Sequence, residues 1–311
     1  MPTSPFSAST LLAGAWRQPV QMLAEQNVGG RSSIHDDATA QKVGFQGGTI
    51  EGPTHFSQFD PLGFQLFGQK WFEQGCISAR YRNACVAGEE VQAWALPSAG
   101  RASSTQAGMQ KRDGSVVLTA SVSVGANDEP TEVEDLLARL RPADKLLILS
   151  DIRVGMTGAE PEEVIMDFDQ KMGALYPFTL RSKLKHITEP CAWYTEEGAA
   201  DSPWGRPIIP FEMISVLAQY TASKARFPIK PSVGLFVNQE IRLVAGPLFV
   251  GERYRVERQV IALSESKRAE SMWVRSSILS ESDELVASII LNTAAMKASY
   301  ENYDTERAAL T

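Results

Sequence analysis

The sequence carries one succession of landmarks twice, and this restricts the chain to folds built from two similar units. In each copy a polar loop leads into an apolar helix, followed by a Gly-Glu turn and a β-hairpin. The paired landmarks are the helix starts at Ile50 and Ile208, the Gly-Glu turns at Gly88 and Gly251, and the hairpin turns at Asp113 and Asp283. Their separations are 158, 163 and 170 residues, a slowly growing offset that a duplication with small loop insertions would produce.

Each copy is predicted to form one helix and about four antiparallel strands. Alternating residues with β-branched and aromatic side chains indicate the strands, and an Asp-Gly pair between two such runs favours a hairpin. The predicted strands are 76–86, the part of 86–95 that follows its glycine turn, 104–111, 116–124, 145–154, 233–244, 249–257, 272–279 and 285–291. One predicted helix starts at 53, and the other spans 207–225. These elements indicate an α+β chain of two tandem repeats, each with an antiparallel sheet around a central helix.

The boundary between the repeats is predicted from composition. Residues 129–144 are acidic, have prolines near each end and could hold a short helix, so we interpret them as a linker. The N-terminal repeat is then 1–128 and the C-terminal repeat 145–311. Within the latter, 158–201 shows no pattern that predicts an element.

Composition excludes several classes of function. The net charge of -7 argues against nucleic acid as a partner, and no apolar run approaches the roughly 20 residues of a membrane span. No lysine or arginine precedes Arg17, which argues against a signal peptide, so a cytoplasmic location is expected. The three cysteines and three histidines are scattered, so no metal and no redox cofactor is expected.

The stretch 31–59 concentrates the residues that suit chemistry. His35 is followed by two acids, then by a glycine pair, and Glu51-Gly52-Pro53 opens an apolar helix. Proline is favoured in the first turn of a helix, and the free N–H groups there suit a carboxylate, a phosphate or a developing oxyanion. We therefore interpret this stretch as the functional site of the protein.

The same stretch resembles the MaoC-like dehydratase and (R)-specific enoyl-CoA hydratase family, whose members have a hot-dog fold. That family's signature is an Asp, a His five residues later, an Asp two beyond it, an Ala, a Gly-Phe, and Ile-Ala-His-Gly at the helix start. The matching positions here are His35, Asp37, Ala40, Gly44–Phe45 and Ile50–Glu51–Gly52. The close match covers roughly 25 residues, and the order of elements extends the resemblance to a double hot-dog fold over most of the chain.

Two departures from the signature affect the expected chemistry. The family's catalytic Asp corresponds to Gly30, and the His before the helix glycine corresponds to Glu51. The first change removes half of the usual acid/base pair, and the second introduces a carboxylate at the helix start. The second repeat has Trp193 and Tyr194 at the position offset from His35, so one site per chain is expected, at the seam between the repeats.

The resemblance implies hydration or dehydration of an acyl thioester of the (R)-3-hydroxyacyl/enoyl-CoA type. His35 would be the acid/base, with Glu51 or Asp37 as its carboxylate partner. The Gly52 N–H, with that of Gly48, would meet the thioester oxygen. His55 and Asp36 complete the predicted substrate-binding set. Coenzyme A or a carrier thioester would enter as part of the substrate, and a homodimer could form through sheet edges or helix backs.

Each of these residues also has a structural interpretation. Asp36 and Asp37 are typical turn and N-cap residues, and Glu51 could complement the helix dipole. His55 could be a satisfied core histidine. Arg80 and Arg82 could reach a phosphate of coenzyme A or line a solvated face. Two other functions stay open: a hot-dog thioesterase that uses Glu51, and a protein that binds an acyl ligand without turning it over.

Overall fold

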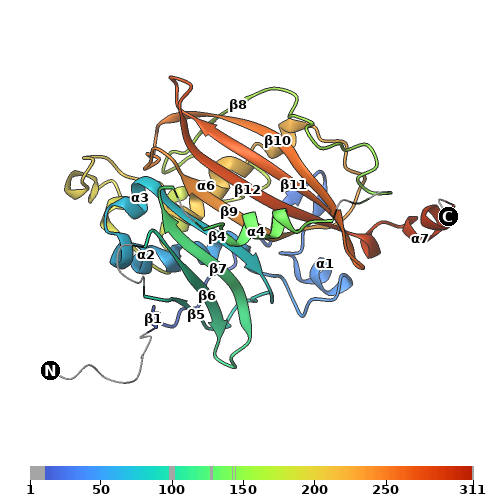
Figure 1. Cartoon of the computed structure of the whole chain (residues 1–311), viewed down its shortest axis with the longest axis horizontal. Helices are drawn as coiled ribbons and strands as arrows, with labels where there is room; N and C mark the ends of the chain where they lie inside the picture. Colours follow the sequence, from blue (N-terminus) through green and yellow to red (C-terminus); the bar gives the residue numbers. More distant parts are fainter. Residues whose placement is uncertain (1–10, 98–101, 127–128, 142, 144, 310–311) are drawn as a thin grey trace.

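The computed structural model describes residues 11–97, 102–126, 129–141, 143 and 145–309. Within them, ten strands form one antiparallel sheet in the order β1-β5-β6-β7-β4-β9-β12-β11-β10-β8 (Figure 1). The strands of the first half are β1 (Leu12–Ala13), β4 (Gly75–Tyr81), β5 (Val91–Ala95), β6 (Ser104–Lys111) and β7 (Val116–Val124). Those of the second half are β8 (Glu162–Ile165), β9 (Gly234–Leu243), β10 (Arg253–Glu265), β11 (Ala269–Leu279) and β12 (Leu285–Met296). A separate small hairpin joins β2 (Asn27–Val28) to β3 (Arg31–Ser32).

The two halves meet at one strand pair in the middle of the sheet. Strand β4 pairs with β9 from Cys76↔Arg242 to Arg80↔Asn238, with Ile77 and Ile241 directly opposite each other. On either side of this seam the strand order is mirrored, since β7, β6 and β5 follow β4 as β12, β11 and β10 follow β9. The predicted arrangement of two tandem units with antiparallel sheets is therefore confirmed.

The repeated landmarks also have equivalent backbone contacts. Just before each central helix, a short bridge ties the chain to the Gly-Glu turn, at Thr49↔Val86 in the first half and at Ile208↔Phe249 in the second. Both turns place their glycine at positive φ, +87° for Gly88 and +78° for Gly251, a region that glycine enters without steric cost. The two copies therefore share the join between loop and helix as well as the sheet.

The central helices cover the inner face of the sheet. They are η1 (Gly52–Phe59) with α2 (Asp60–Phe67) in the first half and α6 (Phe211–Gln219) in the second. Pro53 lies in the first turn of η1, and Phe56 and Phe59 are fully buried. At the end of η1, Pro61 has no N–H to donate to Ser57 four residues back, and Asp60 donates to that carbonyl instead, which is a 3₁₀ contact.

The remaining helices are short. They are α1 (Asp37–Lys42), α3 (Lys70–Gln74), α4 (Glu132–Ala138), α5 (Leu180–Leu184), η2 (Ala192–Tyr194), η3 (Ala199–Asp201), η4 (Ala222–Ala225), η5 (Lys297–Ser299) and α7 (Tyr303–Ala308). Helix α4 lies in the predicted linker, starts with a capping box at Thr131, and crosses the outer face of the sheet (Figure 1). The predicted helix 207–225 is shorter than expected, because the bridge at Ile208 keeps the chain extended up to Pro210.

The prediction of a strand at 145–154 is wrong. This segment is a series of turns whose apolar side chains, including Leu147 and Ile148, are buried. Its backbone N–H groups bind the carboxylate of Glu270 on β11 instead of a neighbouring strand, with Leu147, Ile148 and Leu149 donating at 2.8, 2.9 and 3.0 Å. The Tyr303 hydroxyl of α7 donates to the same carboxylate at 3.0 Å.

Because Glu270 satisfies three buried N–H groups, we expect Glu270→Ala to lower the free energy of unfolding by about 3 kcal/mol. The loss would be measured by urea denaturation, with faster hydrogen exchange at Leu147 and Ile148 as a local readout. Glu257→Ala, which removes an exposed carboxylate from the neighbouring strand, is the control and should cost under about 1 kcal/mol. Equal losses in the two variants would contradict the role given to Glu270.

Candidate functional site

A cavity of about 1320 Å³ lies at one end of the seam and is lined by both halves of the chain. The first half contributes His35, Glu51, Gly52 and His55, and the second half contributes Tyr176. Four of the residues singled out in the sequence therefore share one cavity. Asp36, Asp37 and Gly48 do not line it.

His35 is buried, with 9% of its surface exposed, and its ring orientation is fixed by one hydrogen bond. Its Nδ1 lies 2.6 Å from the carbonyl oxygen of Thr49. Because a carbonyl only accepts, Nδ1 carries the proton and Nε2 keeps its lone pair in the neutral ring. Burial lowers the pKa of His35, which the bond to Thr49 opposes, so the imidazole is neutral at pH 7 and can accept a proton.

The acids beside His35 shape the loop. Asp36 is the N-cap of α1 and accepts from the Thr39 N–H at 2.8 Å, and Asp37 accepts from the Gly48 N–H at 2.7 Å. The Gly48 N–H is thus engaged with Asp37, and its role toward a thioester oxygen stays a prediction. The prediction that Asp37 partners His35 is not supported by this geometry, because its carboxylate lies outside the cavity. Gly48 is needed because a Cβ there would lie 2.3 Å from the His35 carbonyl oxygen.

Glu51 is a buried carboxyl at the start of η1, 7% exposed. It makes no side-chain cap bond, and its Oε1 instead accepts from the Tyr176 hydroxyl at 2.9 Å. Burial raises the pKa of Glu51 to about 7, while the Tyr176 hydrogen bond and the charge of Lys183 act in the opposite direction. Near neutral pH this group therefore exists in both protonation states and can give or take a proton.

Tyr176 and Lys183 are site residues that sequence reasoning missed. Both come from 158–201, where no periodic pattern was visible, and both reach Glu51 or its helix across more than 100 residues of sequence. The tyrosine within the Leu-Tyr-Pro-Phe run was the one available signal, since a tyrosine in an apolar run needs a partner for its hydroxyl.

Gly52 and His55 complete the inner wall of the cavity. A Cβ on Gly52 would lie 2.3 Å from Cζ of Tyr81, so only glycine lets the Tyr81 ring pack against the helix start. As the first residue of η1, Gly52 has an N–H that no helix carbonyl can accept. Burial lowers the pKa of His55 to about 4, so its ring is neutral, and its Nδ1 has no partner among the described residues.

Gly30 stands at the tip of the β2–β3 hairpin. Gly29 and Gly30 have φ values of +60° and +86°, and the Gly30 N–H donates to Asn27 Oδ1 at 2.7 Å. Two consecutive positive φ values are typical of a tight hairpin turn that favours glycine. The backbone here thus suits a turn, and the position that carries the family's Asp holds no side chain.

The corresponding region of the second half is filled by aromatic rings. Trp193 packs edge-on against Phe72 and Trp204, at centroid distances of 5.5 and 5.7 Å. Nearby, Asp60 accepts from Trp71 Nε1 at 2.9 Å and from the Tyr194 hydroxyl at 2.7 Å. Burial raises the pKa of Asp60 to about 7 despite these donors. The region around Trp193 is therefore packed with aromatic rings, whereas the region around His35 in the first half is a polar loop.

Two features, a metal site and a membrane span, are absent from the described ranges. No group of three or more His, Cys, Asp or Glu side chains there could hold a metal ion. In the same residues, no helix combines the length and apolar character needed to cross a membrane.

The architecture can be compared with known proteins. No protein-family model and no curated protein matches the sequence. A MaoC domain dehydratase from Chloroflexus aurantiacus superposes with a TM-score of 0.56 at 12% identity, covering 95% of this chain and 99% of the other. A conserved hypothetical protein from Mycobacterium tuberculosis with a double hot-dog fold gives 0.51 at 14% identity, covering 93% and 96%. The chain has the double hot-dog fold.

A third neighbour in shape is a MaoC-like dehydratase, with a TM-score of 0.51 at 13% identity over 91% of this chain and 98% of the other. The predicted double hot-dog fold and the structural resemblance to MaoC-like dehydratases are confirmed by these matches. At 12–14% identity the shared property is the fold, and the residues of the site must carry any statement about chemistry.

The two buried carboxyls should make stability depend on pH. Because the folded-state pKa values of Glu51 and Asp60 are raised to about 7, these two groups bind more protons in the folded protein than in the unfolded chain between pH 5 and 7. Their contribution is present below about pH 4 and is lost as pH rises to 7, with a slope of about 1.4 kcal/mol per pH unit for each group.

His35 and His55 are buried with lowered pKa values, so their contribution to stability runs in the opposite direction over this window. We therefore expect the free energy of unfolding of the wild type, measured by urea denaturation, to fall from pH 5 to pH 7 relative to that of the double variant Glu51→Gln/Asp60→Asn. Asp36→Asn, at a partly buried helix cap, should leave the wild-type dependence unchanged. A difference between wild type and double variant that stays constant over this window would contradict the assignment.

Proposed function

We propose that this protein is a hydro-lyase that hydrates or dehydrates an acyl thioester of the (R)-3-hydroxyacyl/enoyl type, with one site per chain. The observation that carries the proposal is the pairing, in one cavity, of a neutral imidazole with a carboxyl of pKa about 7. One group is ready to accept a proton and the other is half protonated at neutral pH. The Glu51 carboxyl takes the place of the acid missing at Gly30.

The chemistry follows from these protonation states. In hydration, His35 Nε2 removes a proton from water as its oxygen bonds to Cβ of the enoyl group. The electrons of the double bond move toward the thioester carbonyl, and protonated Glu51 delivers a proton to Cα. Dehydration runs the same transfers backward, so no oxidant, reductant or metal is required.

The developing charge on the thioester oxygen needs a donor. The Gly52 N–H lies at the start of η1, beside the cavity, where a helix favours negative charge. A backbone donor of this kind is worth on the order of 3 kcal/mol in the transition state. Tyr81 and Tyr176 hold the surrounding groups in place through Gly52 and Glu51.

The cavity also offers a route for an anionic carrier arm. Pairing between β4 and β9 stops at Arg80↔Asn238, while the N–H groups of Arg82 and Asn83 still donate to Val117 on the other side. The seam opens there, and cavity-lining residues stand on both faces of the sheet. Tyr81 faces the helix, so Arg80, the residue before it in β4, faces outward, because successive side chains of a strand alternate.

Positive charge gathers around this opening although the chain is acidic overall. The cavity-lining cations that form no salt bridge with any of the described residues are Lys42, Arg80, Arg82, Arg226 and Arg268. Such a set suits the phosphates of coenzyme A or of a carrier-bound pantetheine arm. The names of two neighbours in shape, both MaoC-type dehydratases, support the same reaction class.

The test is a paired assay on purified protein with short, long and aromatic trans-2-enoyl-CoA substrates. We expect the enoyl absorbance to fall without release of free thiol, with kcat/KM decreasing above about pH 7 as Glu51 loses its proton. His35→Ala and Glu51→Gln should each lower kcat/KM by at least about 100-fold. His186→Ala, at an exposed histidine outside the cavity, is the matched control and should keep full activity.

Other outcomes would replace this proposal. Release of free thiol that depends on Glu51 would identify a thioesterase. Binding of the thioesters with neither signal would identify an acyl-ligand-binding protein, and the loss of His35 would then change only affinity.

A further inference from the structure

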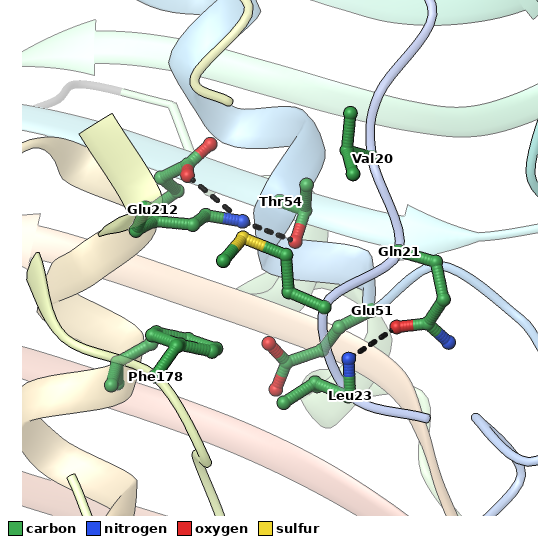
Figure 2. Close-up of a pocket in the computed structure, with 10 residues that line it drawn as sticks. Val20, Gln21, Leu23, Glu51, Thr54, Phe178 and Glu212 are labelled. Carbon is green, nitrogen blue, oxygen red and sulfur yellow. Dashed lines mark hydrogen bonds and ion pairs between the residues drawn. The ribbon is translucent and has the colours of Figure 1, made fainter. Parts of the chain in front are cut away.

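A second, much smaller cavity also borders Glu51. Its volume is about 10 Å³, enough for about one water molecule, and Glu51 lines both this cavity and the large one. In Figure 2 the Glu51 carboxylate lies between Leu23 and Phe178 and faces into this space. Glu51 is therefore in contact with both the substrate-side cavity and the small one.

The polar wall of the small cavity is a buried ion pair. Lys183 Nζ lies 3.2 Å from Glu212 Oε1 and 3.3 Å from Thr54 Oγ1, and both contacts are drawn in Figure 2. Glu212 also accepts from the Ser57 hydroxyl at 2.6 Å. The side chains of Lys183 and Glu212 are 5% and 1% exposed. The pair comes from the second half and is fastened to η1 of the first half by Thr54 and Ser57.

Stability alone does not account for such a pair. Moving two charges out of water costs several kcal/mol for each ion, and a well-packed apolar pair is often as stable or more stable. Here the pair sits beside the one cavity-lining carboxyl whose protonation the proposed chemistry uses. The positive charge of the lysine and the negative charge of the glutamate have opposite electrostatic effects on the ionisation of Glu51.

We propose that the buried Lys183–Glu212 pair is a positioning pair that sets the proton occupancy of Glu51 across the small cavity. The inference rests on the proposed function of Glu51 as the proton carrier. The lysine ammonium favours the ionised carboxylate, Glu212 opposes it, and the balance keeps Glu51 able to cycle between both forms. Neither residue touches substrate, so their effect reaches the reaction through Glu51.

Other charged or titratable groups also face Glu51, and the test must separate them. Tyr176 comes from the loop before α5, Tyr81 from β4, and His55 lies on η1 itself. The lysine also acts on His55, whose pKa it helps to lower. Substitutions of Lys183 and of Glu212 should therefore shift the titration midpoint of Glu51 in opposite directions, while both tyrosines are kept.

The experiment is a ¹³C NMR titration of protein labelled at the glutamate carboxyl carbons, with the Glu51 signal assigned by its absence in Glu51→Gln. We expect Lys183→Met to raise the Glu51 midpoint by about one pH unit, and Glu212→Gln to lower it. Lys183→Arg should stay close to wild type because it keeps the charge. Lys230→Met, which removes a half-exposed surface pair, is the matched control.

The falling limb of the pH–rate profile should move with the NMR midpoint in each variant. If the wild type turns over no enoyl thioester, the proposed function fails while the titration still tests the coupling. Midpoints that do not move, or that move in the same direction in both variants, would overturn the positioning role. If Lys183→Met does not fold, Glu212→Gln and Lys183→Arg still test the proposal. Only an effect of charge would lower the Glu51 midpoint in Glu212→Gln and leave it unchanged in Lys183→Arg.

Discussion

The β4–β9 seam is the constraint on which the rest of the molecule depends. Because the two halves share one continuous ladder there, their central helices must lie side by side beneath it. Contacts such as Ser57 to Glu212, 2.6 Å, follow directly from that placement. The cavity opens where this ladder ends, at Arg80↔Asn238. The extent of the β4–β9 hydrogen-bond ladder, which joins the repeats, thus also determines where the cavity opens.

That placement puts charge in the middle of an apolar core. Glu51, Asp60, Lys183 and Glu212 are all buried, and each would be costly without partners. The structure offsets the cost in two ways, by donors such as Tyr176 and Trp71 and by raised pKa values that keep Glu51 and Asp60 partly neutral. The two carboxyls differ in access, since Glu51 lines both cavities described above and Asp60 lines neither. Similar electrostatics therefore leave a titratable group beside a cavity at one place and a packed hydrogen-bond network at the other.

The sequence predicted what depends on neighbouring residues. Strands β6 and β7 begin and end at the predicted residues, because alternation and the Asp-Gly turn determine that hairpin locally. The segment 145–154 has the same apolar character, yet Glu270, more than 100 residues away, binds its N–H groups and prevents a strand. His35, Glu51 and Gly52 could be found because they are close in sequence. Tyr176, Lys183 and Glu212 could not, since only the folded chain brings them to Glu51.

The proposed use of an acid at position 51 in place of one at position 30 has a physical reason in this fold. A carboxylate at position 30, in the β2–β3 turn, would need a backbone φ of +86°, which residues other than glycine rarely adopt. A carboxylate at position 51 stands before a helix start, is buried, and has a hydroxyl donor from the second half. Burial raises its pKa, and the Tyr176 hydrogen bond and then the charge of Lys183 act against this, so the pKa is about 7. The proposed proton-transfer role of Glu51 therefore depends on both repeats, because the first supplies the carboxyl and the second supplies Tyr176 and Lys183.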